Sequence, residues 1–169
     1  FAAPNPGGSH QVPAEKSIAG KLNDPTVPVL EKAALAFPDT PEGKLAMKQS
    51  LGRIAAAQAS GEAPDDMACP LQTATRQNRA RGVLWRADKA NYSDLAKIKA
   101  PVLVADGRDD IIDPPRNSSI IAARVPFAWL AFYEGGHAFM READPAAYHE
   151  PSATLAWERT RMFLRRHLG

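Results

Sequence analysis

The sequence predicts an α/β fold with two parallel strands, a crossover helix between them and a helical region before them. Two short apolar runs, residues 101–105 (PVLVA) and 129–133 (WLAFY), show no polar alternation. Such runs are typical of strands buried on both faces of a parallel sheet. Between them Pro115 opens a segment with apolar residues at helical spacing,. Strand, helix and strand in this order predict a right-handed crossover between parallel strands.

The chain divides at about residue 94. Residues 1–94 are expected to form loops and loosely packed helices, and residues 95–169 to form the core that contains the two strands. The helical candidates in the first part are residues 27–37, a segment that begins near Thr40 and ends at Ser60-Gly61, and residues 71–87. We expect Trp85, in the last of these, to be a core or interface residue rather than part of a pocket.

The clearest helix start in the first part is the run Thr40-Pro41-Glu42. It supplies a capping hydroxyl, a proline at the first helical position and an acid in the first turn. One apolar stripe then follows at helical spacing, made of Met47, Leu51, Ile54 and Ala55,.

Residues 151–168 are predicted to form an amphipathic helix that packs on the sheet. One side of it gathers Ala153, Ala156, Trp157, Thr160, Phe163, Leu164 and Leu168,. The arginines near its end suit the negative end of a helix dipole, so we interpret them as a solvated face rather than a nucleic-acid site. His149 and His167 lack any motif context and are expected at the surface.

Composition excludes several classes of function. The chain has 169 residues, 44% hydrophobic content and a formal net charge of +2, which is ordinary for one globular domain and indicates neither a nucleic-acid nor a membrane partner. No run approaches the roughly 18 apolar residues of a membrane span. A single cysteine, Cys69, excludes an intrachain disulfide, and together with the absence of a signal segment it favours a cytoplasmic location.

An acid and a histidine follow the two predicted strands. Asp110 lies in the acidic loop 106–110 after the first strand, and His137 follows Gly135-Gly136 after the second. Because parallel strands end at one edge of a sheet, the two side chains are expected to meet there, where ligands bind in open α/β sheets. A carboxylate that orients an imidazole suggests a general base. Spacing leaves Asp109 open as the alternative acid.

These residues resemble the C-terminal part of an α/β-hydrolase. In that family a strand ends in G-x-x-D followed by apolar residues and proline, and residues 107–114 (GRDDIIDP) fit this pattern. A later strand ends in a glycine-rich turn and histidine, which residues 134–137 (EGGH) fit, although Glu134 stands where glycine or proline is more usual. The resemblance implies that Asp110 and His137 are the triad acid and base, with no cofactor. It also implies that the helices before the first strand form a lid over the active site.

A nucleophile is missing from this pattern. The G-x-S-x-G elbow, which presents serine on a sharp strand-to-helix turn, does not occur in the sequence. Ser9, Ser60 and Cys69 are poor substitutes, since none has both the flanking glycines and a preceding strand. The chain therefore resembles a hydrolase that starts partway through. We expect an N-terminal segment or subunit to carry the nucleophilic serine, and expect that partner strands cover the exposed edge of the sheet.

Two classes of function follow from the sequence. The first is part of a serine hydrolase that acts on a carboxylic ester or a related small acyl substrate, with the chain supplying the acid, the base and the lid. Amide, thioester, C–C bond and perhydrolase chemistry use the same triad in this family and stay open. The second is a non-catalytic hydrolase-like module that binds a ligand or a partner.

Overall fold

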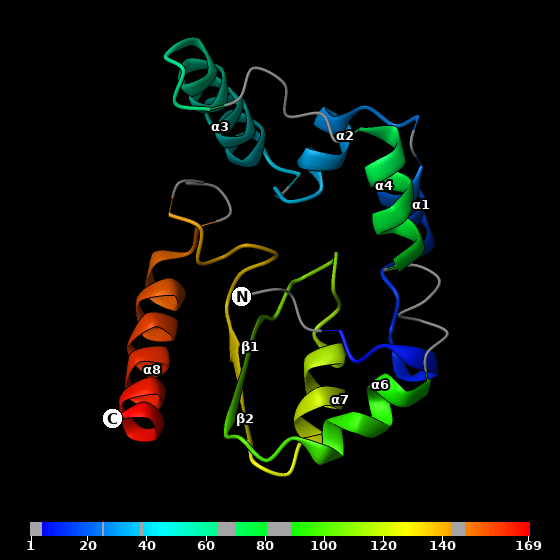
Figure 1. Ribbon diagram of the computed structural model, residues 1–169. Helices are drawn as coiled ribbons and strands as arrows, with labels where there is room; N and C mark the ends of the chain where they lie inside the picture. The colour runs from blue at the N-terminus through cyan, green and yellow to red at the C-terminus, as the bar shows by residue number, and fades with distance from the viewer. Residues whose placement is uncertain (1–4, 25, 38, 64–69, 81–88, 143–147) are drawn as a thin grey trace.

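The computed structural model describes residues 5–24, 26–37, 39–63, 70–80, 89–142 and 148–169. Within these ranges a two-stranded sheet lies between two helices, α7 (Arg116–Arg124) and α8 (Glu150–Leu168), and the remaining helices lie beside it and beyond the carboxyl ends of its strands (Figure 1). The predicted α/β architecture is confirmed.

The sheet has the predicted topology. Strand β1 (Val102–Gly107) pairs in parallel with β2 (Ala128–Tyr133), in a register that sets Val102 opposite Ala128 and Gly107 opposite Tyr133. Helix α7 connects the strands and contacts both. Because the first and last residues of the two strands pair with each other, β1 and β2 end side by side. The loops that follow them therefore leave the sheet at the same edge.

Helix α8 packs on the sheet through small residues. Ala153 and Ala156 are completely or almost completely buried, and Tyr133, Phe139 and Ala156 form a hydrophobic core with the rings of Tyr133 and Phe139 stacked. The prediction that all the apolar residues on one side of this helix pack on the sheet is wrong in part. Trp157, Leu164 and Leu168 are 50%, 44% and 79% exposed, whereas the buried stripe of the helix is made of Ser152, Ala153, Ala156 and Thr160.

The expectation that both strands are buried on both faces is also wrong in part. Val104 is 5% exposed, but Trp129 and Leu130 on β2 are 45% and 40% exposed. Among the described elements, α7 and α8 make the main contacts with the sheet, and they do not cover all of its apolar side chains.

The segment before the first helix is held against α7 by one buried amide. The side chain of Asn117 is 0% exposed. Its Oδ1 accepts from the Val12 N–H at 2.7 Å, and its Nδ2 donates to the Val12 carbonyl at 2.9 Å. Two hydrogen bonds satisfy an amide that would otherwise be costly to bury. The short helix η1 (Gly8–His10) lies in this segment, and His10 stacks on Tyr92.

The first part of the chain is helical where it is described. Its elements are α1 (Lys16–Asn23), α2 (Val29–Ala34), α3 (Pro41–Ala59), α4 (Leu71–Asn78), α6 (Lys89–Asp94) and η3 (Leu95–Lys97). Thr40 caps α3 as predicted, its hydroxyl accepting from the Gly43 N–H at 3.1 Å. The helix predicted over 27–37 is shorter, since its last residues form turns. Trp85 and Cys69 lie outside the described residues. None of the described helices has the length and apolarity to cross a membrane.

Candidate active site

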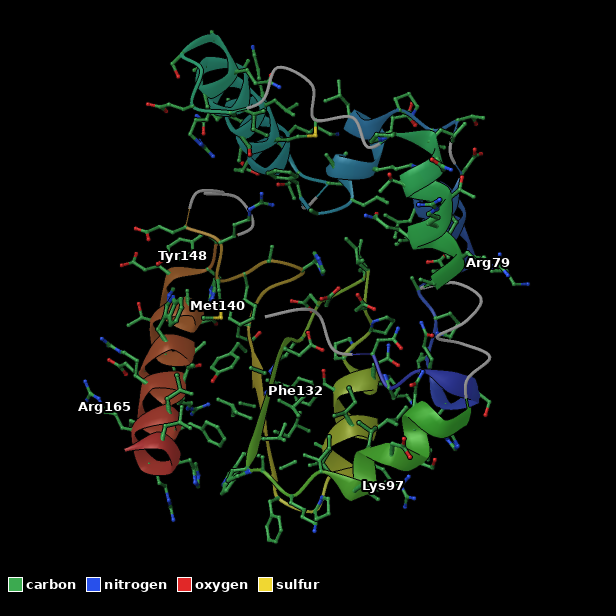
Figure 2. All side chains as sticks on the ribbon, viewed as in Figure 1. Arg79, Lys97, Phe132, Met140, Tyr148 and Arg165 are labelled. Atoms are coloured by element: carbon green, nitrogen blue, oxygen red, sulfur yellow. The ribbon has the colours of Figure 1, made fainter. Side chains whose placement is uncertain are left out.

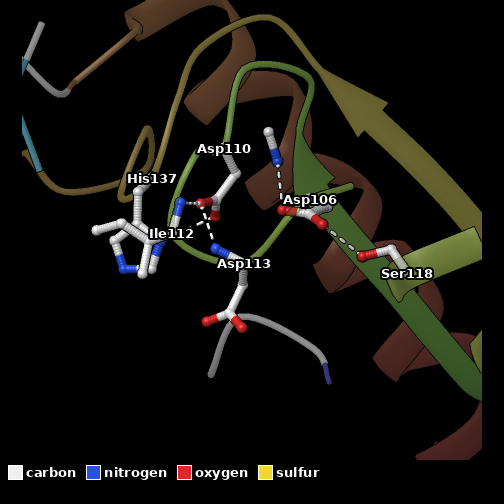
Figure 3. Close-up of polar contacts among 7 residues, drawn as sticks. Asp106, Asp110, Ile112, Asp113, Ser118 and His137 are labelled. Atoms are coloured by element: carbon white, nitrogen blue, oxygen red, sulfur yellow. Dashed lines mark hydrogen bonds and ion pairs between the residues drawn. The ribbon is translucent and has the colours of Figure 1, made fainter. Parts of the chain in front are cut away.

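The loops after β1 and β2 bring the predicted acid and base together. His137 Nδ1 and Asp110 Oδ2 are 2.8 Å apart, although 27 residues separate them in the chain (Figure 3). The Asp110 side chain is 4% exposed and the His137 side chain 30%. The bond to Nδ1 leaves Nε2 as the ring nitrogen that can act on another group.

Asp110, rather than Asp109, is the acid that contacts His137. Its second oxygen, Oδ1, accepts from the backbone N–H groups of Ile112 and Asp113, both at 2.9 Å (Figure 3). Three hydrogen bonds therefore hold the carboxylate in one orientation. Asp109 is exposed. The two adjacent aspartates thus occupy different environments, which their spacing did not reveal.

Backbone contacts join the acid loop to the base loop. The Arg108 N–H donates to the Tyr133 carbonyl at 2.8 Å, and the Asp109 N–H to the Gly135 carbonyl at 3.1 Å. An exposed ion pair of 3.0 Å between Arg108 and Glu134 joins the same loops. Glu134, the departure from the usual hydrolase pattern, thus has a local partner, although an exposed pair contributes at most about 1 kcal/mol.

The base loop has unusual backbone geometry on both sides of His137. Gly135 has a φ of 118° and Ala138 a φ of 68°. Among the described residues, Ala138 is the one residue other than glycine with a positive φ. An alanine in the left-handed region is costly unless its surroundings impose that conformation. Here the Phe139 carbonyl accepts from the His149 N–H at 3.0 Å, and Phe139 is packed in the core. The loop is therefore held on both sides of the histidine.

The electrostatics of the pair favour a protonated histidine. The hydrogen bond to Asp110 raises the pKa of His137 above its usual value, against the opposing effect of burial. The negative charges of Asp110, Asp113 and Asp106 act in the same direction as the hydrogen bond. The imidazolium that forms when His137 takes a proton is thus stabilised by the site.

A second buried carboxyl, Asp106, lies at the end of β1 and was not singled out from the sequence. It is 4% exposed, accepts from the Ser118 hydroxyl at 2.5 Å and from the Gly107 N–H at 2.8 Å (Figure 3). Burial raises its pKa to about 6, and the nearby charges of Asp110 and Asp113 add to this while the hydrogen bonds oppose it. In the sequence, only the position of Asp106 at the end of an apolar run could have suggested that its side chain is buried.

Asp106 is expected to make stability fall as pH rises. Its pKa is about 6 in the folded protein and about 3.9 in an unfolded chain, so the folded state binds the proton more tightly. Its stabilising contribution is complete below about pH 4 and is lost as pH rises through about 6, by at most about 3 kcal/mol. The free energy of unfolding, measured by urea denaturation across this window, should show the decline, and Asp106→Asn should flatten it.

The exposed neighbour Asp109 supplies the control, because Asp109→Asn should leave the decline unchanged. The raised pKa of His137 also lowers stability as pH rises, but it acts above about pH 6.5. The contribution of Asp106 is therefore measured below that value. An Asp106→Asn protein with the same pH dependence as the parent would contradict the assignment.

A cavity of about 730 Å³ opens over His137. Its lining on the core side includes Asp109, Ile111, Gly135, Gly136, His137, Tyr148 and His149. The other side is lined by residues of α1, α2, α3 and the turn after α2, such as Lys21, Leu35, Phe37, Gly43 and Met47. Tyr148, one of the lining residues, lies near the N-terminal end of α8 (Figure 2). The cavity is large enough for a small organic substrate.

The two serines considered as nucleophiles, Ser9 and Ser60, do not contribute to this cavity. Ser9 is in η1, and Ser60 caps the end of α3, where its hydroxyl donates to the Ala57 carbonyl at 3.1 Å. Neither residue lines the cavity. Across the described ranges, no group of three His, Cys, Asp or Glu side chains is placed to hold a metal ion.

Comparison with known proteins identifies a family to which the sequence is similar. Residues 68–168 match the model of the dienelactone hydrolase family. Among solved structures, an α/β fold family hydrolase from Bacillus anthracis str. Sterne is similar, with 20% sequence identity and a TM-score of 0.43. The matched region covers 73% of this chain and 41% of the length of that structure, so the chain spans less than half of the protein it resembles. No curated protein matches the sequence.

The family match contains the strands and loops that position the acid and the base. It runs from residue 68 to residue 168, and so includes β1, the Asp110 loop, β2, the His137 loop and nearly all of α8. Since the match covers more than half of the 169 residues, the chain belongs to the dienelactone hydrolase family, and its α/β core is that of a hydrolase.

Proposed function

We propose that this chain supplies the acid, the base and the lid of a hydrolase that acts on carboxylic esters or related acyl compounds. The observation that carries the proposal is the 2.8 Å contact between Asp110 Oδ2 and His137 Nδ1 at the floor of a cavity. Membership of a hydrolase family supports it further. The nucleophile, expected to be serine, comes from a segment or polypeptide outside these 169 residues.

In this proposal His137 Nε2 takes the proton of the nucleophile as its oxygen attacks the ester carbonyl. Asp110 stabilises the imidazolium that results, and the tetrahedral intermediate collapses when Nε2 returns the proton to the leaving alcohol. Water then attacks the acyl-enzyme with Nε2 again as base, which releases the carboxylic acid and the free nucleophile. The chemistry works equally for a thiol nucleophile, since an oriented imidazole activates either group.

Helices α1, α2 and α3 act as the lid in this proposal. They contribute one side of the cavity over His137, with apolar residues Leu35, Phe37 and Met47 among those that face it. A lid of this kind excludes water from the reacting groups and selects substrates by the shape of the cavity.

The proposal is tested by comparing the chain alone with the protein produced together with its preceding coding sequence. The chain alone should neither react with a serine-directed fluorophosphonate nor hydrolyse p-nitrophenyl butyrate. The longer protein should be labelled once per site and hydrolyse the ester, and His137→Ala should remove that activity. Labelling by iodoacetamide instead would identify a cysteine nucleophile.

Two outcomes would contradict this function. Labelling of Ser9 or Ser60 in the chain alone, with ester hydrolysis, would show that the nucleophile lies within these residues. A longer protein that hydrolyses no ester, or that keeps full activity with His137→Ala, would favour the alternative of a non-catalytic binding module.

A further inference from the structure

A second histidine, His149, lies in the wall of the cavity over His137. It precedes α8 directly, as the N-cap residue of that helix. Its backbone N–H donates to the Phe139 carbonyl, two residues beyond His137. A Cβ placed on Gly135 would lie 3.5 Å from the His149 Cβ. The backbone of the base loop therefore holds His149 next to the proposed active site.

One ring nitrogen of His149 is fixed by a buried hydroxyl. Nδ1 lies 2.7 Å from the Oγ of Ser152, a residue that is 6% exposed. Ser152 is in the first turn of α8, where the free backbone N–H groups create a positive potential. That potential favours a lone pair, rather than a proton, on the nitrogen that faces the helix. In the arrangement that this potential favours, the Ser152 hydroxyl donates to Nδ1 and the proton of the neutral imidazole is on Nε2.

The Nε2–H of His149 is available to a ligand. Among the described residues it has no hydrogen-bond partner, and its ring lines the same cavity as His137. The opposite side of the cavity includes the apolar side chains of Leu35, Phe37 and Met47. A donor from His149 therefore distinguishes substrates that carry an acceptor from those that do not.

We propose that His149 determines the specificity of this site, with Nε2–H donating a hydrogen bond to an oxygen on the acyl chain of the substrate. The substrate class is thereby narrowed to esters whose acyl chain carries an ether, keto or hydroxyl oxygen. This inference rests on the proposed hydrolase function. His137 and Asp110 perform the chemistry, and His149 binds a part of the substrate that does not react.

The test uses the protein that contains the nucleophile and four matched esters. These are p-nitrophenyl hexanoate and three analogues in which an ether oxygen replaces the methylene at position 3, 4 or 5 of the acyl chain. His149→Phe keeps the size of the ring and removes the donor. For at least one analogue, the ratio of its kcat/KM to that of hexanoate should fall about five- to ten-fold in the variant, the effect of one neutral hydrogen bond. Any general change in activity affects hexanoate and the analogues alike, so the ratio isolates the loss of the hydrogen bond.

A second variant and a spectroscopic measurement separate binding from a structural role. Ser152→Ala should lower the same ratio, and ¹⁵N NMR of the imidazole should show the proton of His149 on Nε2 in the parent protein. Unchanged ratios for all three analogues in His149→Phe, or a proton on Nδ1, would overturn the inference while ester hydrolysis persists. Failure of the parent to hydrolyse any ester would overturn the proposed function itself.

Discussion

Replacing Asp110 by asparagine is expected to lower the kcat of ester hydrolysis roughly 1,000- to 10,000-fold, with KM little changed. The Asp110 carboxylate contacts His137 Nδ1 at 2.8 Å and raises the pKa of the imidazole. An asparagine amide can present a donor to Nδ1, which favours the wrong tautomer, and it cannot stabilise the imidazolium. Steady-state kinetics of the protein that contains the nucleophile measures the effect.

Asp109→Asn is the matched control for this experiment. The two aspartates are adjacent, but Asp109 is exposed and its described hydrogen bond, to the Gly135 carbonyl, comes from the backbone. Its replacement should therefore change kcat less than about three-fold, the scale of a surface substitution. A larger loss in Asp109→Asn than in Asp110→Asn would reassign the acid.

The second large effect is expected for Gly107→Ala, at the end of β1. A Cβ at Gly107 would lie 2.5 Å from the Gly135 carbonyl oxygen and 2.7 Å from that of Gly136. Both atoms belong to the backbone of the base loop, so no side-chain rotation relieves the clash. We expect a loss of about 1–3 kcal/mol in the free energy of unfolding, and roughly 100-fold in kcat/KM because His137 moves with its loop.

Gly52→Ala serves as the control for the glycine substitution. Gly52 lies within α3, and a Cβ there would meet nothing within 4 Å. The change should raise the free energy of unfolding by about 0.5–1 kcal/mol, because alanine loses less backbone entropy in a helix than glycine. Denaturant unfolding and ester kinetics on both variants provide the comparison. A Gly107→Ala protein as stable and active as the parent would show that the two loops do not approach each other this closely.

The parts of the fold that the sequence predicted well depend on local patterns. Each of β1, β2 and α8 lies within two residues of its predicted bounds, because apolar runs and helical spacing are properties of neighbouring residues. The contact of Asp110 with His137 was predicted from the parallel order of two strands. Spacing alone left Asp109 open as the acid, because it does not reveal which side chain turns inward at the end of a loop. The resemblance to the hydrolase pattern favoured Asp110, and Asp110 is the residue that contacts His137.

The features that were missed depend on contacts between distant segments. Asp106 is buried because α7 covers it and Ser118 binds it. His149 is exposed, as expected, but its place beside the cavity was not foreseen, because it depends on the contacts of the start of α8 with the Phe139 carbonyl and Ser152. The exposure of Trp157 and Leu164 depends on which side of α8 faces the sheet. A single sequence contains no local pattern for any of these.

The short chain distance between acid and base has a consequence for the order of assembly. With 27 residues between Asp110 and His137, the length-dependent entropy of closing that loop is roughly 3 kcal/mol. One strand–helix–strand unit provides this closure within a single stretch of chain, so acid and base can meet without any docking step. A nucleophile from another segment or polypeptide would have to arrive later by docking. The imidazole would then be oriented first in a catalytically inactive assembly intermediate. Hydrolysis would begin only when the nucleophile has docked.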